Sequence, residues 1–116
     1  MDEGLGERLF QFALKTIKYC KTIKYSIENK VLVNQLVKSA TSSGANFEEA
    51  QSASSKADFK HKIDISLREM RESNYWLRIF IQLESTNSNL DFLIKESEEL
   101  KRILGSISSK VAKSIK

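Results

Sequence analysis

Apolar residues recur every three or four positions along four stretches of the chain, the spacing that places them on one face of an α-helix. The stretches cover about residues 5–26, 29–53, 57–84 and 89–115. We therefore predict four helices over these ranges. Only short polar segments separate them, so each helix is expected to run antiparallel to the one before it.

Residues that interrupt helices are scarce. The chain has no proline and only four glycines, so the turn residues that strands need are nearly missing as well. A length of 116 residues is typical of one domain. We predict a single domain over residues 1–116 that folds as an all-α, antiparallel up-down-up-down four-helix bundle.

The helical spacing breaks down between residues 75 and 83, where only Arg78 and Gln82 are polar. Apolar side chains there point in nearly every direction around the helix, and one bundle core covers only one face. One interpretation is ordinary apolar surface. The interpretation we favour is a subunit interface of a homo-oligomer, because tryptophan and tyrosine are enriched at interfaces. Its candidate residues are Tyr75, Trp76, Ile79 and Phe80.

Three polar residues lie near the predicted core faces. Asn46 and Glu49 are about one turn apart in the second helix, and Glu72 follows Met70 in the third. Carboxylates near a core are unfavourable unless they are paired. We predict that Asn46, Glu49 and Glu72 form a structural hydrogen-bond network, in preference to a ligand site.

The net charge of +4 conceals basic segments at both ends of the domain. From residue 8 to residue 38 there are seven bases and one acid, and residues 101–116 hold five bases and no acid. Basic surfaces attract phosphate backbones, although solvated lysines are also common in proteins that bind no nucleic acid. Four lysines three residues apart are our candidates for nucleic-acid contact, and they would spread over half of the first helix: Lys15, Lys18, Lys21 and Lys24.

Catalytic chemistry is poorly represented. His61 is the only histidine, and Asp58 and His61 give the carboxylate–histidine spacing of a di-iron bundle only once, where such a site needs two. Cys20 falls on the apolar face of the first helix, where a thiol behaves as a small hydrophobe. We predict no catalytic residue, no metal ligand, no cofactor and no enzymatic activity.

The sequence also bears on location. No uninterrupted apolar run approaches the roughly 20 residues that cross a bilayer, so no membrane association is expected. The acidic start, Met1–Asp2–Glu3, lacks the order of a secretion signal, and the single Cys20 has no disulfide partner in the chain. A cytoplasmic protein is the expectation.

Two blocks of sequence carry a family resemblance. Residues 35–50, QLVKSATSSGANFEEA, resemble the signature of the bacterial four-helix-bundle proteins known as the 23S rRNA intervening-sequence proteins, approximately Q-L-x-R-A-A-x-S-I-x-x-N-I-A-E-G. Residues 71–77, RESNYWL, are similar to the family's E-x-x-x-W-L pattern in the third helix, with Phe59 as its preceding phenylalanine. Ser43 replaces the usual isoleucine and Ala50 the usual glycine. The matching positions are Gln35, Ala40, Ser42, Asn46 and Glu49, and Lys38 keeps the charge of an arginine.

The resemblance implies a bacterial cytoplasmic bundle that assembles as a ring, usually a pentamer, without established enzymatic activity. A similar bundle, the accessory variability determinant of diversity-generating retroelements, binds nucleic acid and a reverse transcriptase through a basic surface. Two hypotheses therefore stand. The first is an oligomer that binds RNA or DNA with little sequence preference. The alternative is a structural or protein-interaction bundle with an unknown protein partner and no nucleic-acid role.

Overall fold

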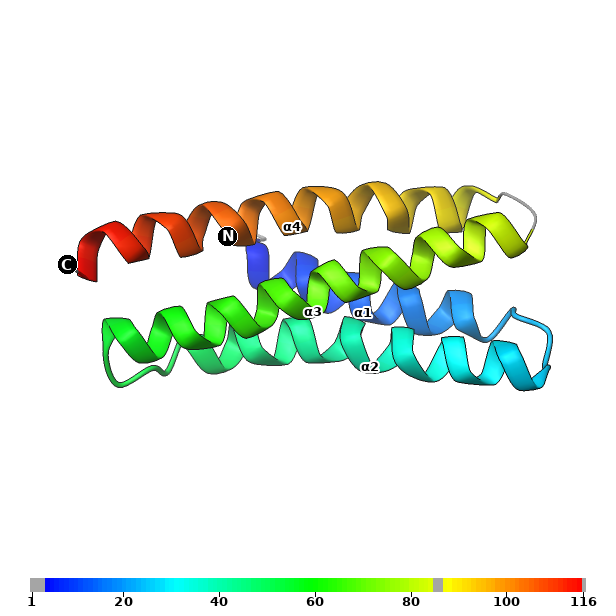
Figure 1. Ribbon diagram of the computed structural model, residues 1–116, viewed down its shortest axis with the longest axis horizontal. Helices are drawn as coiled ribbons and strands as arrows, with labels where there is room; N and C mark the ends of the chain where they lie inside the picture. The colour runs from blue at the N-terminus through cyan, green and yellow to red at the C-terminus, as the bar shows by residue number, and fades with distance from the viewer. Residues whose placement is uncertain (1–3, 85–86, 116) are drawn as a thin grey trace.

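Four helices make up the structure, a computed structural model that describes residues 4–84 and 87–115. They are α1 (Leu5–Cys20), α2 (Ile27–Ala50), α3 (Lys56–Leu83) and α4 (Ser88–Ile115), and these residues include no strand. Consecutive helices run antiparallel in a bundle that measures 48 × 28 × 20 Å (Figure 1). The predicted all-α, up-down-up-down four-helix bundle is confirmed.

Each helix packs against two neighbours. The packed pairs are α1 with α2, α2 with α3, α3 with α4 and α4 with α1, while the diagonal pairs do not pack in the part of the chain that the structure describes. This cyclic order follows from short connections, because each helix must return beside its predecessor. The arrangement places α1 and α4 side by side even though they are the first and last helices.

Side-chain caps fix where three of the helices begin. The Ser26 hydroxyl accepts a hydrogen bond from the backbone N–H of Asn29 at 2.9 Å, and the Ser55 hydroxyl accepts one from Asp58 at 3.0 Å. The Asn87 side-chain oxygen accepts from the N–H of Leu90 at 2.8 Å. Such caps satisfy the N–H groups that the first helical turn leaves unpaired.

Helix α1 ends at Cys20, six residues before the predicted position, whereas the bounds of the other helices lie within three residues of those predicted. The Thr22 hydroxyl donates a hydrogen bond to the Tyr19 carbonyl at 2.7 Å, which satisfies an acceptor at the end of the helix. Ser26 takes an extended backbone conformation as the cap of α2, with φ −160° and ψ 163°. A residue in that conformation cannot continue α1, so the helix must stop earlier.

The core lies along the bundle axis and receives side chains from all four helices. Tyr19 and Phe80 meet edge to face in it, with their ring centroids 6.0 Å apart. Because protein interiors are densely packed, the sizes of the core side chains determine how far apart the helices lie. The largest fully buried apolar side chains are those of Leu9, Phe12, Leu36, Ile63, Met70, Leu77, Phe80, Leu90, Leu93, Leu100 and Leu104.

Short polar side chains fill the contact between α2 and α3. Ser43 donates a hydrogen bond to the Ser66 carbonyl at 2.8 Å, and Ser66 donates one to the Ser43 carbonyl at 2.7 Å. The hydroxyls of Ser39 and Ser73 are 2.8 Å apart. Small side chains let the two helix backbones approach closely, which explains why a stretch rich in serine and alanine is buried in α2.

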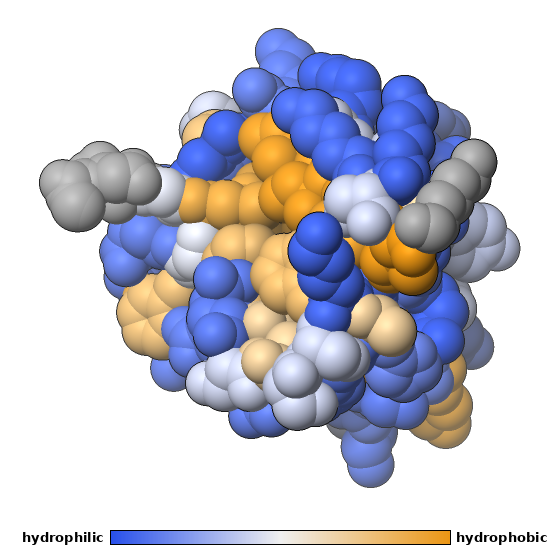
Figure 2. Space-filling view, turned by 90° about the vertical axis from the view of Figure 1, so that its left-hand side faces the viewer, coloured by the Kyte–Doolittle hydropathy of each residue, from blue (hydrophilic) through white to orange (hydrophobic). Residues whose placement is uncertain are grey.

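Helix α1 is shorter than the other three helices, so they continue beyond its N-terminus at one end of the bundle. Figure 2 views this end and shows apolar side chains gathered near its middle, with hydrophilic side chains around them. A hollow of about 360 Å³ at this end is lined by Ala50, Phe59 and Val111, among others. None of the helices in the described part of the chain has an apolar stretch of membrane-spanning length.

Candidate nucleic-acid interface

The four candidate lysines are all exposed, but they do not share one helix face. Lys15 and Lys18 lie on α1, Lys21 is the residue that follows its last turn, and Lys24 lies in the connection to α2. The predicted spread over half of a helix is therefore wrong for the second pair, because α1 ends at Cys20. These four lysines, the basic segment, leave the helix at its end and follow the connection to α2.

Lys15 and Lys18 line a hollow of about 410 Å³ between α1 and α4. Opposite them lies Phe92, whose side chain is 43% exposed. The ammonium group of Lys15 lies 4.6 Å from the centre of the Phe92 ring, a cation–π contact. This aromatic residue was not among the sequence candidates, because only the packing of α4 against α1 brings it to the lysines.

Lys24 lines a different hollow, of about 210 Å³, on the side of α2. Lys30 and Tyr25 line it too, and Tyr25 is one of the most exposed aromatic residues of the chain. The Lys24 carbonyl accepts a hydrogen bond from the Asn29 side chain at 2.9 Å, which holds the connection against the start of α2. The basic segment thus borders two separate depressions.

No carboxylate forms an ion pair with any of the four lysines among the described residues. One ion pair links α1 to α4, where Arg8 lies 2.7 Å from Glu96 and 3.5 Å from Glu99. The hydrogen bond with Glu96 raises the pKa of Arg8 further, and the charged guanidinium compensates the Glu96 carboxylate. The lysine charges remain available to an external anion.

The predicted polar network of Asn46, Glu49 and Glu72 is not present within the chain. Glu49 and Glu72 are exposed, and the Asn46 amide donates to the Ser42 carbonyl at 2.9 Å within its own helix. The physical reason is the penalty for burying a carboxylate without a partner, which serines avoid. The buried polar side chains instead form three separate hydrogen-bonded pairs, Ser39 with Ser73, Ser43 with Ser66, and Asn74 with Ser97.

The pair of Asn74 and Ser97 lies at the contact between α3 and α4. The Asn74 amide donates a hydrogen bond to the Ser97 hydroxyl at 2.9 Å, and the Asn74 oxygen accepts one from Arg78 at 2.9 Å. An asparagine offers both donors and an acceptor, so it can be satisfied while nearly fully buried. Sequence reasoning missed Ser66, Ser73, Asn74 and Ser97, although their spacing in α3 and α4 matches that of the neighbouring apolar core residues.

The candidate interface residues divide into two groups. Phe80 is fully buried in the core against Tyr19, so it is not available to a partner and that assignment is wrong. Tyr75 is 49% exposed, while Trp76 and Ile79 are half-buried. The Tyr75 ring packs edge to face on Trp76 at 5.0 Å, so these two aromatic residues form one surface feature.

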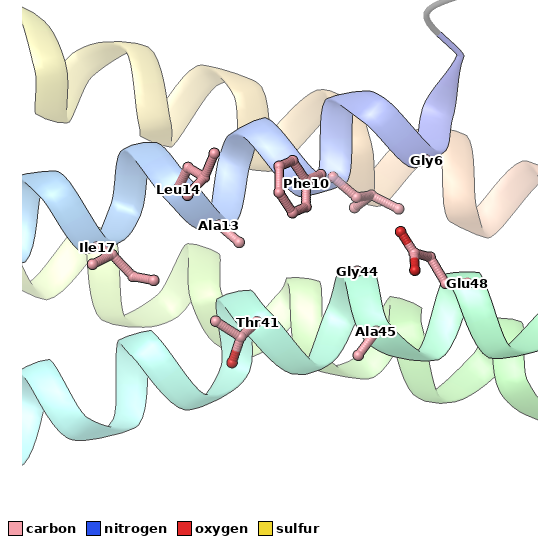
Figure 3. A pocket seen from close by; sticks show the side chains of 10 residues that line it. Gly6, Phe10, Ala13, Leu14, Ile17, Thr41, Gly44, Ala45 and Glu48 are labelled. Atoms are coloured by element: carbon pink, nitrogen blue, oxygen red, sulfur yellow. The ribbon is translucent and has the colours of Figure 1, made fainter.

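A second apolar feature lies between α1 and α2, where a groove of about 300 Å³ runs along the two helices. Figure 3 shows Phe10, Ala13 and Leu14 of α1 on one side, and Ala45 and Glu48 of α2 on the other. Phe10 is 52% exposed, an unusual position for a phenylalanine. Phe10 and Leu14 belong to the regular apolar spacing of residues 5–26, but that spacing alone does not reveal where a bundle leaves a groove open.

The remaining chemically active groups are isolated. Cys20 is buried, and burial raises the pKa of its thiol to about 11, so it stays protonated near neutral pH. His61 is exposed on α3. Across residues 4–84 and 87–115, no three histidine, cysteine or carboxylate side chains are grouped so that they could hold a metal ion.

The comparisons with known proteins agree with this fold. Residues 6–106 match the family described as 23S rRNA-intervening sequence proteins. A crystal structure from Bacteroides thetaiotaomicron VPI-5482, described as a protein with unknown function from the S23 ribosomal protein family, superposes with a TM-score of 0.80. The two chains are 30% identical, and the match covers 90% of this chain and 98% of the other. No curated protein matches.

The four packed helices place this chain in the all-α, four-helix-bundle class of proteins. Its basic segment lies on the surface of that bundle. The family match begins in α1, includes α2 and α3, and ends within α4. The chain belongs to the 23S rRNA-intervening sequence protein family.

Proposed function

We propose that this chain is a non-enzymatic accessory protein of the bacterial cytoplasm that assembles with copies of itself and binds RNA or DNA through the phosphate backbone. The observation that carries the proposal is the basic segment at Lys15, Lys18, Lys21 and Lys24. All four side chains are exposed, and none forms an ion pair with a described carboxylate. Lysines in that state can replace the counterions that surround a nucleic acid.

Binding through the phosphate backbone depends on charge and not on nucleotide sequence. Lysine ammonium groups contact phosphate oxygens, which are the same at every nucleotide, so the expected binding tolerates changes of sequence. In an assembly, the basic segment recurs on every copy, and contacts that are weak singly become strong together through effective concentration. This explains how a chain with net charge of only +4 could hold a nucleic acid.

Substitution of the four lysines by glutamine is the direct test. We expect this variant to lose most of its affinity for RNA at low salt, measured by fluorescence anisotropy, while its helix content and oligomeric state stay unchanged. The matched control replaces four other exposed lysines, Lys38, Lys56, Lys110 and Lys113, and removes the same total charge. The proposal is overturned if the parent binds no nucleic acid, or if both variants lose equal affinity.

Assembly is supported by two apolar features on different parts of one small chain. One is the groove that contains Phe10 and Leu14, and the other surrounds Tyr75 and Trp76. A closed ring needs two different surfaces that fit each other, since each copy contacts two neighbours in different ways. We extend the proposal to such a ring, with five copies as the number expected from the family resemblance.

A structural or protein-interaction bundle is the second candidate function, and the groove between α1 and α2 favours it. Its apolar lining could hold an amphipathic helix of a partner. In that case glutamine at the four lysine positions would leave partner binding unchanged, whereas Phe10→Glu would abolish it.

A further inference from the structure

The hollow between α1 and α4 combines basic and aromatic side chains. It offers two lysines, Lys15 and Lys18, and an aromatic ring, Phe92, that is 43% exposed. Proteins that hold single-stranded nucleic acid combine the same elements, a positive groove for the backbone and aromatic rings on which bases stack. We infer that this hollow binds a single strand of RNA or DNA, with one base on Phe92 and flanking phosphates on Lys15 and Lys18.

The inference rests on the proposed function and specifies its ligand. A duplex keeps its bases stacked inside, so it can contact the lysines but offers no free base to Phe92. A single strand can present both a base and its phosphates to the hollow. The volume of about 410 Å³ is within the range of pockets that hold small molecules, so an unstacked base has room.

The position of Lys15 suits an exchange of partners. Its ammonium group now lies 4.6 Å from the centre of the Phe92 ring, on the surface that a base would occupy. Lysine side chains are flexible and present their charge as a mobile point, so the group can move to a phosphate as the base enters. The cation and the ring are then both engaged by one ligand.

Polar side chains at the other end of the hollow fit the ligand as well. Thr22 contributes a hydroxyl and Asn89 an amide, and both line the hollow. Such groups contact sugars, phosphates and base edges in nucleic-acid complexes. Within the described part of the chain, no carboxylate lines this hollow.

Acidic residues lie next to this hollow, on the side of Phe92 away from Lys18, and they restrict where a phosphate can bind. Lys15 and Phe92 also border a neighbouring hollow of about 200 Å³, and Glu7 and Glu96 line that one. Glu96 is engaged by Arg8, but Glu7 forms no ion pair among the residues of known placement and would repel a phosphate. The strand is therefore directed from Phe92 toward Lys18 and the end of α1, where Lys21 and Lys24 continue the basic segment.

The test compares single-stranded and duplex oligonucleotides of one sequence, each as RNA and as DNA, by anisotropy at low salt. For the parent we expect tighter binding of the single strands. Phe92→Leu should weaken single-strand binding by about tenfold and leave duplex binding unchanged, while Phe92→Tyr, which keeps the stacking surface, should bind as the parent does. Phe59→Leu changes a phenylalanine that lines the separate hollow containing Ala50 and Val111, outside the proposed binding and assembly surfaces, and should have no effect.

The outcomes separate the inference from the proposed function. If Phe92→Leu binds single strands as tightly as the parent, stacking is overturned while phosphate binding stands. If the parent binds neither form, both the inference and the proposed function fail. Circular dichroism of Phe92→Leu checks that the bundle is intact, and Phe92→Tyr supplies the comparison if it is not. A preference between the RNA and DNA single strands identifies the natural source of the ligand.

Discussion

At the scale of single residues, buried serines pair with each other inside this bundle and long charged side chains stay outside. Ser43 and Ser66 each donate to the other's backbone carbonyl, so neither hydroxyl leaves an unsatisfied group. Glu49 and Glu72 are exposed, where water solvates the carboxylate. The polarity of a residue in a core-facing stretch therefore has to be judged together with its size.

Asp64 provides a test at this scale. Burial alone would raise the pKa of its carboxyl, but hydrogen bonds from Lys60 and Ser108 and the nearby positive charges outweigh that effect, and the pKa lies below the usual aspartate value. A depressed pKa stabilises the fold above the unfolded-state pKa of about 3.9, and this contribution is lost as the pH falls through the folded-state value. We expect Asp64→Asn to have a lower Tm at pH 7 and a smaller deficit in acid.

Thermal unfolding of the parent, Asp64→Asn and Ser108→Ala between neutral pH and about pH 3 measures this effect. Ser108→Ala removes one of the hydrogen bonds and should fall between the other two. Ser109→Ala, at the adjacent exposed position, is the control and should follow the parent. A deficit for Asp64→Asn that is the same at every pH would refute the assigned role.

At the scale of elements, the helices were predictable because their apolar spacing is long and regular. The end of α1 was not, since it depends on local hydrogen bonds at Thr22 and Ser26 and not on spacing. For the same reason, only part of the candidate site could be predicted from the sequence. Lys15 and Lys18 could be found from their repeat, whereas Phe92 comes from α4 and meets them only in the folded bundle.

Gly105 offers a test of how helix propensity in α4 contributes to the stability of the fold. It lies within α4, and a Cβ added there would meet no atom within 4 Å beyond its chain neighbours and the adjacent helix backbone. Glycine in a helix interior is less favourable than alanine by about 1 kcal/mol, so Gly105→Ala should raise the free energy of unfolding by up to that amount. Urea unfolding gives this value, and Ser106→Gly, at the next and exposed position, should lower it. A loss of stability in Gly105→Ala would show that this part of α4 is tightly packed.

At the scale of the whole molecule, apolar surface lies outside the single core. The groove with Phe10 and the pair Tyr75 and Trp76 belong to different helices, and each leaves large side chains partly exposed. The sequence indicated the apolar surface at Tyr75 and Trp76, because the apolar run from residue 75 to 83 covers more than one helix face. It misplaced Phe80, since only the structure shows which side of α3 faces Tyr19.

Sedimentation tests the assembly that these surfaces support. We expect the parent chain to sediment as an oligomer at micromolar concentration, and Tyr75→Glu to dissociate toward the 13.3 kDa single chain with its helix content retained. Burying an unpaired charge in an apolar interface is strongly unfavourable, which gives the direction of the effect. Ile115→Glu, an exposed apolar position near the end of α4, should remain assembled. A parent that sediments as a single chain contradicts the ring.

Binding through phosphates is the central claim, and the slope of log affinity against log salt concentration measures it most directly. Each phosphate neutralised on a single strand contributes about −0.7 to that slope. For single-stranded RNA we predict a steep, linear decrease for the parent and a clearly shallower one when Lys15, Lys18, Lys21 and Lys24 are replaced by glutamine. An affinity that does not change with salt, or an equal slope in both proteins, would contradict the account.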